Sequence, residues 1–311
     1  MLNVDVTPQS KLLAAHYVLG EQKLAWHELA DHQVRAKQFA MPLQADLWGW
    51  GNIYQTTSSI TEMAIKTARM TLAEAGYTGQ DIDTTIVCSS SLQSGTEAHQ
   101  RFLAEFATML QLEQSEIIGV SLGRCTNLLK GIHLARSLIQ STQARRILII
   151  TCDAISDEQL RMENFALFSD GAASCLICHA DDAPLQGNTL IASGGRQNHS
   201  QLHQGLSAGL VKAVNQDLFS SAGITLSDIT RLFHSNVYLP LCQLNEMQAG
   251  YQQTQLYTDN IPRFGHCFAA DPLINFIDAS NDGIVSDTAL CQLAVSIPGA
   301  RASLLLRKGS A

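Results

Sequence analysis

The sequence predicts a mixed α/β fold in which helices cover both faces of a sheet. From about residue 60 onward, strand-like and helix-like segments alternate with short links between them. The strand-like segments are apolar throughout, whereas strands with one face in water alternate apolar and polar residues. Together these two observations are typical of parallel strands inside a layered α/β protein.

The first part of the chain contains seven of the expected elements. Residues 10–55 are not assigned by their pattern, and we expect a loop at 47–51, which contains two tryptophans. Helical periodicity runs from residue 60 to Gly76, a residue suited to the end of a helix. The elements expected after it are a strand at 84–89, a helix at 97–111, a strand at 116–122, a helix at 125–141, and strands at 145–152 and 173–180.

The second part echoes the first more compactly. The turn-forming residues at 181–188 predict the join, and we therefore expect two halves, 1–182 and 183–311. The expected elements are a helix at 203–222, a strand within 228–237, helices at 239–250 and 269–279, and two final strands that meet at a turn containing Pro298 and Gly299.

Composition narrows the class of protein. Of the 311 residues, 46% are hydrophobic and 15% charged, which predicts a large buried core. The net charge of −8 argues against a nucleic-acid or anionic-membrane partner, and no apolar run approaches membrane-spanning length. The first residues lack the features of a signal peptide, and most of the eight cysteines lie in apolar runs, so we expect reduced thiols and a cytoplasmic location.

One cysteine pattern resembles a haem attachment site, but its position in the sequence does not fit one. Cys175 and Cys178 precede His179, but they lie inside an apolar strand-like run. No second pair of cysteines or histidines follows at the spacing of a zinc finger. We therefore expect no metal and no permanently bound cofactor.

Cys125 is the candidate nucleophile. It lies between an apolar strand-like run and an amphipathic helix, and the start of a helix carries partial positive charge and unpaired N–H groups. Both features favour a thiolate, which is the reactive form of cysteine. A thiolate with backbone donors beside it is suited to accept an acyl group.

Four motifs occur in the order and rough spacing of a known family. They are Gly123-Arg-Cys-Thr-Asn-Leu-Leu-Lys, Phe168-Ser-Asp-Gly-Ala-Ala, Phe233-His-Ser-Asn-Val and Asn260-Ile-Pro-Arg-Phe-Gly-His-Cys-Phe-Ala-Ala. Together they resemble the β-ketoacyl-acyl-carrier-protein synthase III branch of the thiolase superfamily, from about residue 60 to residue 308. The resemblance implies a thiolase-like αβαβα fold of two similar halves, with the active site between them.

The resemblance also implies an acyltransferase. Cys125 would take an acyl group from acyl-CoA or an acyl carrier protein and hold it as a thioester. The backbone N–H groups of Cys125 and Gly299 would stabilise the oxyanion, although the turn near Gly299 has fewer glycines than the family's. The family further implies a homodimer, or a heterodimer with a related subunit.

Two histidines are the implied catalytic partners of Cys125. His234, if neutral, either donates a hydrogen bond to a carbonyl oxygen or deprotonates an acceptor. His266 occupies the position that the family usually gives to Asn, and a histidine can also move a proton. Both decarboxylative condensation and acyl transfer to a carbon, oxygen or nitrogen acceptor therefore stay open.

The departures from the family pattern allow two further interpretations. The His at 266, the glycine-poor final turn and the short second half favour a specialised polyketide or fatty-acid-like pathway. The same departures would also suit a non-catalytic partner subunit of a thiolase-like heterodimer, although Cys125 and His234 are retained.

Overall fold

The computed structural model describes residues 9–92, 94–183 and 187–309 and has a nine-stranded sheet at its centre. The strand order is β5-β4-β6-β7-β1-β8-β11-β10-β9. The strands are β1 (Ser10–Leu19), β4 (Thr84–Cys88), β5 (Glu116–Val120), β6 (Arg146–Asp153), β7 (Gly171–His179), β8 (Asn188–Gln197), β9 (Arg231–Phe233), β10 (Leu290–Ile297) and β11 (Ala300–Arg307). At the seam, β1 pairs with both β7 and β8, and the division into halves at 182/183 stays a prediction.

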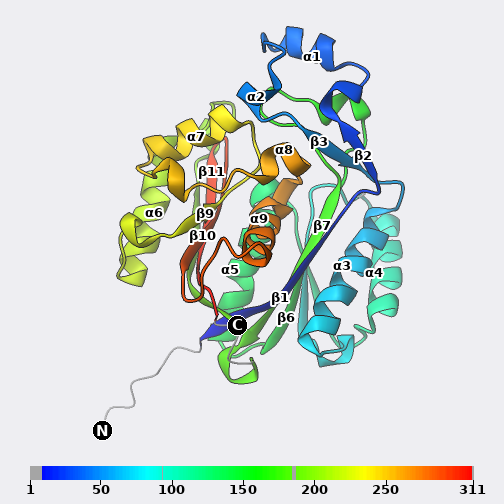
Figure 1. The fold of residues 1–311 in the computed structure, drawn as a ribbon. Coiled ribbons are helices and arrows are strands. Elements are labelled where there is room, and N and C mark those ends of the chain that lie inside the picture. The colour runs from blue at the N-terminus through cyan, green and yellow to red at the C-terminus, as the bar shows by residue number, and fades with distance from the viewer. Residues whose placement is uncertain (1–8, 93, 184–186, 310–311) are drawn as a thin grey trace.

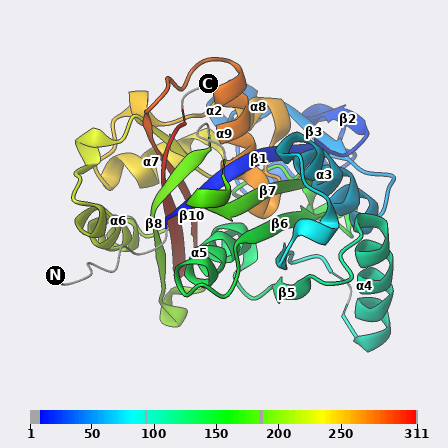
Figure 2. The same ribbon diagram turned by 90° about the horizontal axis from the view of Figure 1, so that it is seen from below.

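Helices form three layers around the strands (Figures 1 and 2). α3 and α4 lie on one side, α6 and α7 lie on the other, and α5 and α9 lie between the two parts of the sheet. The helices are α3 (Ile60–Ala75), α4 (Thr96–Leu110), α5 (Asn127–Gln140), α6 (Ala208–Ala222), α7 (Leu239–Gln248), α8 (Asn260–Phe264) and α9 (Asp271–Asn281). None of these described helices is long and apolar enough to cross a membrane.

The predicted coverage of both sheet faces is confirmed along β6. Its Ile147 and Ile149 pack in the same core cluster as α5, whereas its Leu148 and Ile150 pack in the cluster that contains α3. Every second residue thus faces a different helix layer, which is why the strand is apolar throughout.

The expectation of parallel strands is only partly right. β4 is parallel to β5 and β6, and β9 is parallel to β10. The β6–β7, β7–β1, β1–β8, β8–β11 and β10–β11 pairs are antiparallel. An apolar strand pattern indicates that both faces of the strand are buried, but it does not indicate the direction in which the strand runs. A parallel neighbour of β6 would need a crossover helix, whereas β7 follows β6 through a loop.

Several boundaries agree with the sequence and others are corrected. α3 starts after the cap Ser59 and ends at Gly76, whose φ is 72°. The expected helix at 125–141 starts later, because Cys125 lies in a short 3-10 turn, η3 (Arg124–Thr126), before α5. The expected helix at 203–222 starts only at Ala208, after its cap Ser207, and the sequence patterns missed β8 and α8.

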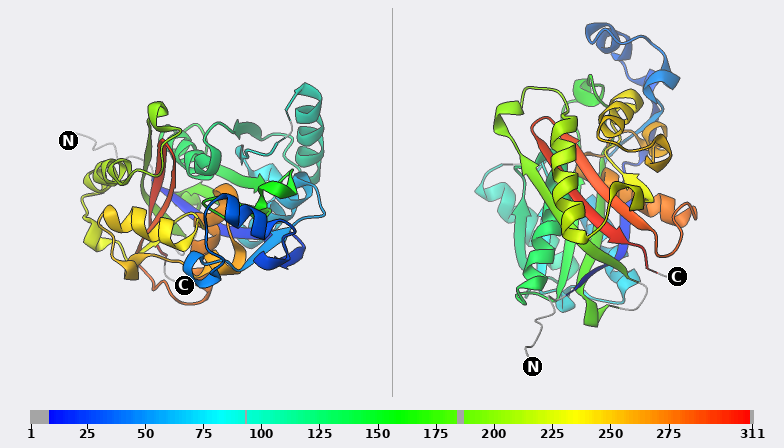
Figure 3. Two further views of the ribbon diagram at one scale, coloured as in Figure 1. Left: turned by 90° about the horizontal axis from the view of Figure 1, so that it is seen from above. Right: turned by 90° about the vertical axis from the view of Figure 1, so that its left-hand side faces the viewer.

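Residues 20–55 form a small lobe at one end of the molecule (Figure 3). It contains the paired strands β2 (Gln22–Ala25) and β3 (Asn52–Gln55) and the helices α1 (His32–Gln38) and α2 (Ala45–Trp48). The loop expected at 47–51 is therefore partly helical. Trp50 is buried, with its ring centroid 4.9 Å from that of Trp26 and 6.0 Å from that of Tyr238.

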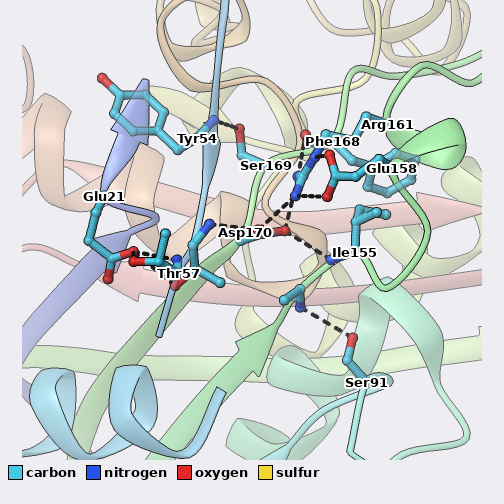
Figure 4. Close-up of polar contacts among 12 residues, drawn as sticks. Glu21, Tyr54, Thr57, Ser91, Ile155, Glu158, Arg161, Phe168, Ser169 and Asp170 are labelled. Atoms are coloured by element: carbon cyan, nitrogen blue, oxygen red, sulfur yellow. Dashed lines mark hydrogen bonds and ion pairs between the residues drawn. The ribbon is translucent and has the colours of Figure 1, made fainter. Parts of the chain in front are cut away.

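A buried carboxylate, that of Asp170, joins this lobe to the loop between β6 and β7 (Figure 4). It accepts hydrogen bonds from the backbone N–H groups of Thr56 (2.8 Å) and Ile155 (2.9 Å). The guanidinium of Arg161, also buried, donates to it at 3.0 and 2.8 Å and is paired in addition with Glu158. One anion therefore fixes two points of the β6–β7 loop to the segment directly after β3, which lies more than 100 residues earlier in the sequence.

Asp170→Asn should destabilise the fold strongly, because it leaves Arg161 buried with only part of its compensating charge. We expect a loss of about 3 kcal/mol in the free energy of unfolding, measured by urea denaturation. The matched control is Asp217→Asn, which breaks an exposed pair with Arg196 and should cost less than about 1 kcal/mol. Equal losses in the two variants would contradict the structural role given to Asp170.

Candidate active site

Cys125 lies in a tightly bonded turn between β5 and α5. Asn127 closes the turn: its side-chain oxygen accepts from the N–H of Gly123 (2.7 Å), and its amide donates to the Ser121 carbonyl (3.1 Å). Arg124 has a φ of 53°, a left-handed conformation that strains a residue with a side chain. Cys125 is therefore held in a fixed turn, and its N–H belongs to the first turn of η3, where backbone donors lack intrahelical partners.

A histidine and an aspartate form a chain of contacts with this cysteine. His266 Nε2 lies 3.3 Å from Cys125 Sγ, and His266 Nδ1 contacts the carboxylate of Asp271. A carboxylate only accepts, so Nδ1–H donates to Asp271 and Nε2 faces the sulfur. The carboxylate also accepts from the backbone N–H groups of Asn236 and Cys267, both at 2.6 Å.

The charges in this chain favour a protonated His266. Burial lowers its pKa, but Asp271 and Cys125 more than offset this effect and raise the pKa to about 10. At neutral pH the ring is therefore an imidazolium between a carboxylate and a sulfur. Because this pKa lies above the unfolded value of about 6.5, the resulting stabilisation is complete below about pH 6.5 and is lost as pH rises through about 10.

The backbone of His266 is docked on the loop that follows Arg161. Its N–H donates to the Leu167 carbonyl (2.7 Å), and its carbonyl accepts from the N–H of Ser169 (3.0 Å). The residue directly before His266 must be a glycine for the backbones to approach so closely, because a Cβ on Gly265 would lie 2.5 Å from the Leu167 oxygen. The ring centroid of His266 is 5.0 Å from that of Phe168, so an aromatic wall helps to bury the imidazole.

The other two predicted site residues, His234 and Gly299, do not belong to the chain of contacts around His266. The ring of His234 is buried and contacts the Ser235 carbonyl and Cys242 Sγ; in the described part of the chain it has no hydrogen bond with Cys125. Gly299 lies in the β10–β11 turn, and Arg124 donates to its neighbour Pro298 (2.7 Å), which ties this turn to η3. The oxyanion role of Gly299 stays a prediction, as do the catalytic roles of the three side chains.

Asp271 was not predicted from the sequence as a site residue. It is the only acidic residue between positions 260 and 277, and it opens an apolar helix that follows His266 directly. Such an isolated acid at the start of a buried helix is the signal that could have identified it, because a buried carboxylate requires donors.

Across the residues that the structure describes, no group of three or more His, Cys, Asp or Glu side chains could hold a metal ion.

Part of the chain is similar in sequence to known synthases. A family model for 3-oxoacyl-[acyl-carrier-protein (ACP)] synthase III matches residues 122–194. A mycobacterial β-ketoacyl-[acyl-carrier-protein] synthase III from Mycobacterium marinum is 32% identical over 143 residues, 45% of this chain. The chain spans only 41% of the length of that curated relative.

Solved structures extend the likeness to nearly the whole chain. The 3-oxoacyl-[acyl-carrier-protein] synthase III from Aquifex aeolicus has a TM-score of 0.78 and 16% identity, over 96% of this chain and 99% of that chain. The acyltransferase ChlB3 has a TM-score of 0.79 and 15% identity, over 97% of this chain and 98% of that chain. At such low identities the likeness concerns the fold, and it confirms the predicted thiolase-like architecture.

Asp271→Asn should lower the reactivity of Cys125 at neutral pH. Without the carboxylate, burial dominates and lowers the pKa of His266, so the sulfur loses its imidazolium partner. We expect carbamidomethylation by iodoacetamide at about pH 7 to slow by about tenfold or more and to recover in more alkaline buffer. Asp278→Asn, on the same helix, is the control. If the pH profile of alkylation were unchanged in Asp271→Asn, this would count against the chain of contacts from Asp271 through His266 to Cys125.

Proposed function

We propose that the chain is a β-ketoacyl-acyl-carrier-protein synthase III-like member of the thiolase superfamily and that it is an acyltransferase. Cys125 takes an acyl group from an acyl-CoA or acyl-carrier-protein thioester and passes it to a carbon, oxygen or nitrogen acceptor. The observation that carries the proposal is the Cys125–His266–Asp271 chain of contacts.

The chemistry follows from the charges of these three residues. The Cys125 thiolate attacks the thioester carbonyl, a tetrahedral oxyanion forms, and the thiolate of the donor leaves. The N–H groups of Cys125 and Gly299 are the proposed oxyanion donors, and one such donor typically contributes about 3–4 kcal/mol to lowering the barrier. The His266 imidazolium, fixed by Asp271, stabilises the sulfur when it is negative.

The same geometry favours an enzyme over a non-catalytic partner subunit. A scaffold needs neither a sulfur at hydrogen-bond distance from an imidazole nor a buried carboxylate behind that ring. Here Asp271 is fully buried and satisfied by backbone donors, an arrangement that is costly unless it orients a charged partner.

We further propose a dimer formed through β5. This strand is the edge of the sheet, its side chains are half-buried or exposed, and Leu122 directly after it is 95% exposed. An unpaired edge strand with apolar neighbours is a template for pairing with another chain. A second copy of this chain is the proposed partner; a related subunit is the alternative if the purified protein is monomeric.

The cellular setting proposed is the cytoplasm, in a polyketide or fatty-acid-like pathway. All eight cysteines are free, as expected for thiols kept in a reducing compartment. His266 at the position of the family's usual Asn supports a specialised pathway.

Incubation with short and medium acyl-CoAs and with acyl-carrier thioesters should add one acyl group to the protein, detected by intact-mass spectrometry. Cys125→Ala should abolish the adduct, whereas Cys291→Ala, a control at a buried thiol, should keep it. His266→Ala should slow acylation by about a hundredfold. No adduct with any donor would overturn the proposed activity, and unchanged pathway output with Cys125→Ala would favour the partner subunit.

Leu122→Asp should convert the dimer to a monomer without loss of fold, because the side chain is almost fully exposed within one chain. Sedimentation velocity measures the change. Val34→Asp, at a 68% exposed residue of α1, is the matched control and should leave the dimer intact. A dimer that persists in Leu122→Asp would exclude this edge as the interface.

A further inference from the structure

The contacts of His266 suit a general base as well as a charged partner of the sulfur. Its Nε2 faces Cys125 Sγ at 3.3 Å, and its Nδ1–H donates to the buried carboxylate of Asp271. A nucleophile, a base within hydrogen-bond reach and a third group that orients the base form the arrangement with which cysteine and serine hydrolases cleave acyl bonds. The three residues therefore fit a second chemical step after the acyl thioester has formed.

A histidine at position 266 can act where an asparagine cannot. An asparagine amide forms hydrogen bonds but has no basic nitrogen, whereas a neutral imidazole has one. Asp271 fixes the tautomer of the ring, because it accepts the Nδ1 proton and leaves the Nε2 lone pair directed at the sulfur. In an acylated Cys125 the acyl carbon is one covalent bond beyond that sulfur. The base therefore faces the atom that a second nucleophile attacks.

Acylation of Cys125 is the event that turns the imidazolium into a base. In the free protein, Asp271 and Cys125 raise the pKa of His266 while burial lowers it. A departing donor thiolate can take the Nε2 proton, and the sulfur is then part of a neutral thioester that no longer raises this pKa. Burial still opposes the charge, so the pKa of the ring falls. The neutral form, with its lone pair toward the acyl group, becomes accessible.

The turn that carries the sulfur lies at the surface of the chain. Cys125 is partly exposed, whereas the other seven cysteines are buried, and the neighbouring Arg124 is exposed. The ring centroid of the exposed Phe165 is 6.3 Å from that of His266, so a single aromatic ring separates the imidazole from solvent on that side. Water can therefore reach a thioester on this sulfur.

The second thiol–imidazole contact of the described chain lacks these features. Cys242 is buried, and burial raises the pKa of its thiol well above the ordinary value. The His234 ring beside it contacts the Ser235 carbonyl and this sulfur, and no hydrogen bond to a carboxylate orients it among the described residues. The hydrolase-like arrangement is therefore specific to Cys125.

We propose that the protein also hydrolyses the acyl thioesters that it takes up, with water as the acceptor and His266 as the general base. This inference rests on the proposed function. The water oxygen bonds to the acyl carbon, and one water proton goes to His266 Nε2. The carbon–sulfur bond then breaks, and its electron pair stays on Cys125 Sγ. The products are a carboxylic acid and the thiolate–imidazolium pair of the free protein, so water is the only further reactant.

The fate of the acyl-enzyme in water enriched in oxygen-18 tests the inference. The protein is acylated with an acyl-CoA that gives the adduct, separated from the donor and followed by intact-mass spectrometry. We expect the unaltered protein to return to its free mass and to release a carboxylic acid that carries one oxygen-18 atom; Cys125→Ala should release none. An adduct as long-lived as the acyl-CoA in the same buffer, or an acid without the label, would overturn the inference and leave the proposed acylation intact.

His266→Asn separates the role of the histidine in acylation from its role as a base. The variant should acylate more slowly, but its acyl-enzyme, once formed, should last about a hundredfold longer than that of the unaltered protein. The matched control is His133→Asn, at an exposed histidine of α5, which should not change the lifetime. Equal lifetimes in His266→Asn and the unaltered protein would refute hydrolysis by this base. Neither an adduct nor labelled acid with any donor would overturn the proposed function together with the inference.

Discussion

The buried carboxylate of Asp271 is the interaction on which the arrangement of the site depends. It receives the His266 ring and the N–H groups of Asn236 and Cys267, and so joins the segment after β9 to the loop after α8. A buried anion is tolerated only where such donors converge, so these segments have one favourable arrangement relative to each other. The position of the imidazole beside Cys125 is a consequence of that requirement.

Most of the fold could be predicted where a segment carries its own signal. α3 has a capping serine, apolar periodicity and a terminal glycine, and the β10–β11 hairpin has its Pro298–Gly299 turn. β8 lacks such a signal, because half-exposed and polar residues interrupt its apolar run. The direction of a strand could not be predicted from its apolar pattern either, since a strand buried on both faces has the same pattern whichever way it runs.

The site was predictable in part, for a related physical reason. The position of Cys125 between strand and helix, and the motif around His266, are local features. The role of Asp271 depends on a donor from Asn236, 35 residues away in the sequence. The contacts of the His234 ring with the Ser235 carbonyl and with Cys242 likewise depend on side-chain orientations that no periodicity reveals.

The place of β1 in the middle of the sheet has a consequence for how the chain is made on the ribosome. This strand is synthesised before its neighbours β7 and β8, which are more than 150 residues further along. At translation rates of about 5–20 residues per second, β1 waits on the order of ten seconds with both hydrogen-bonding edges unpaired. Such a strand is open to wrong partners during that interval, so the nascent chain is a natural client for chaperones.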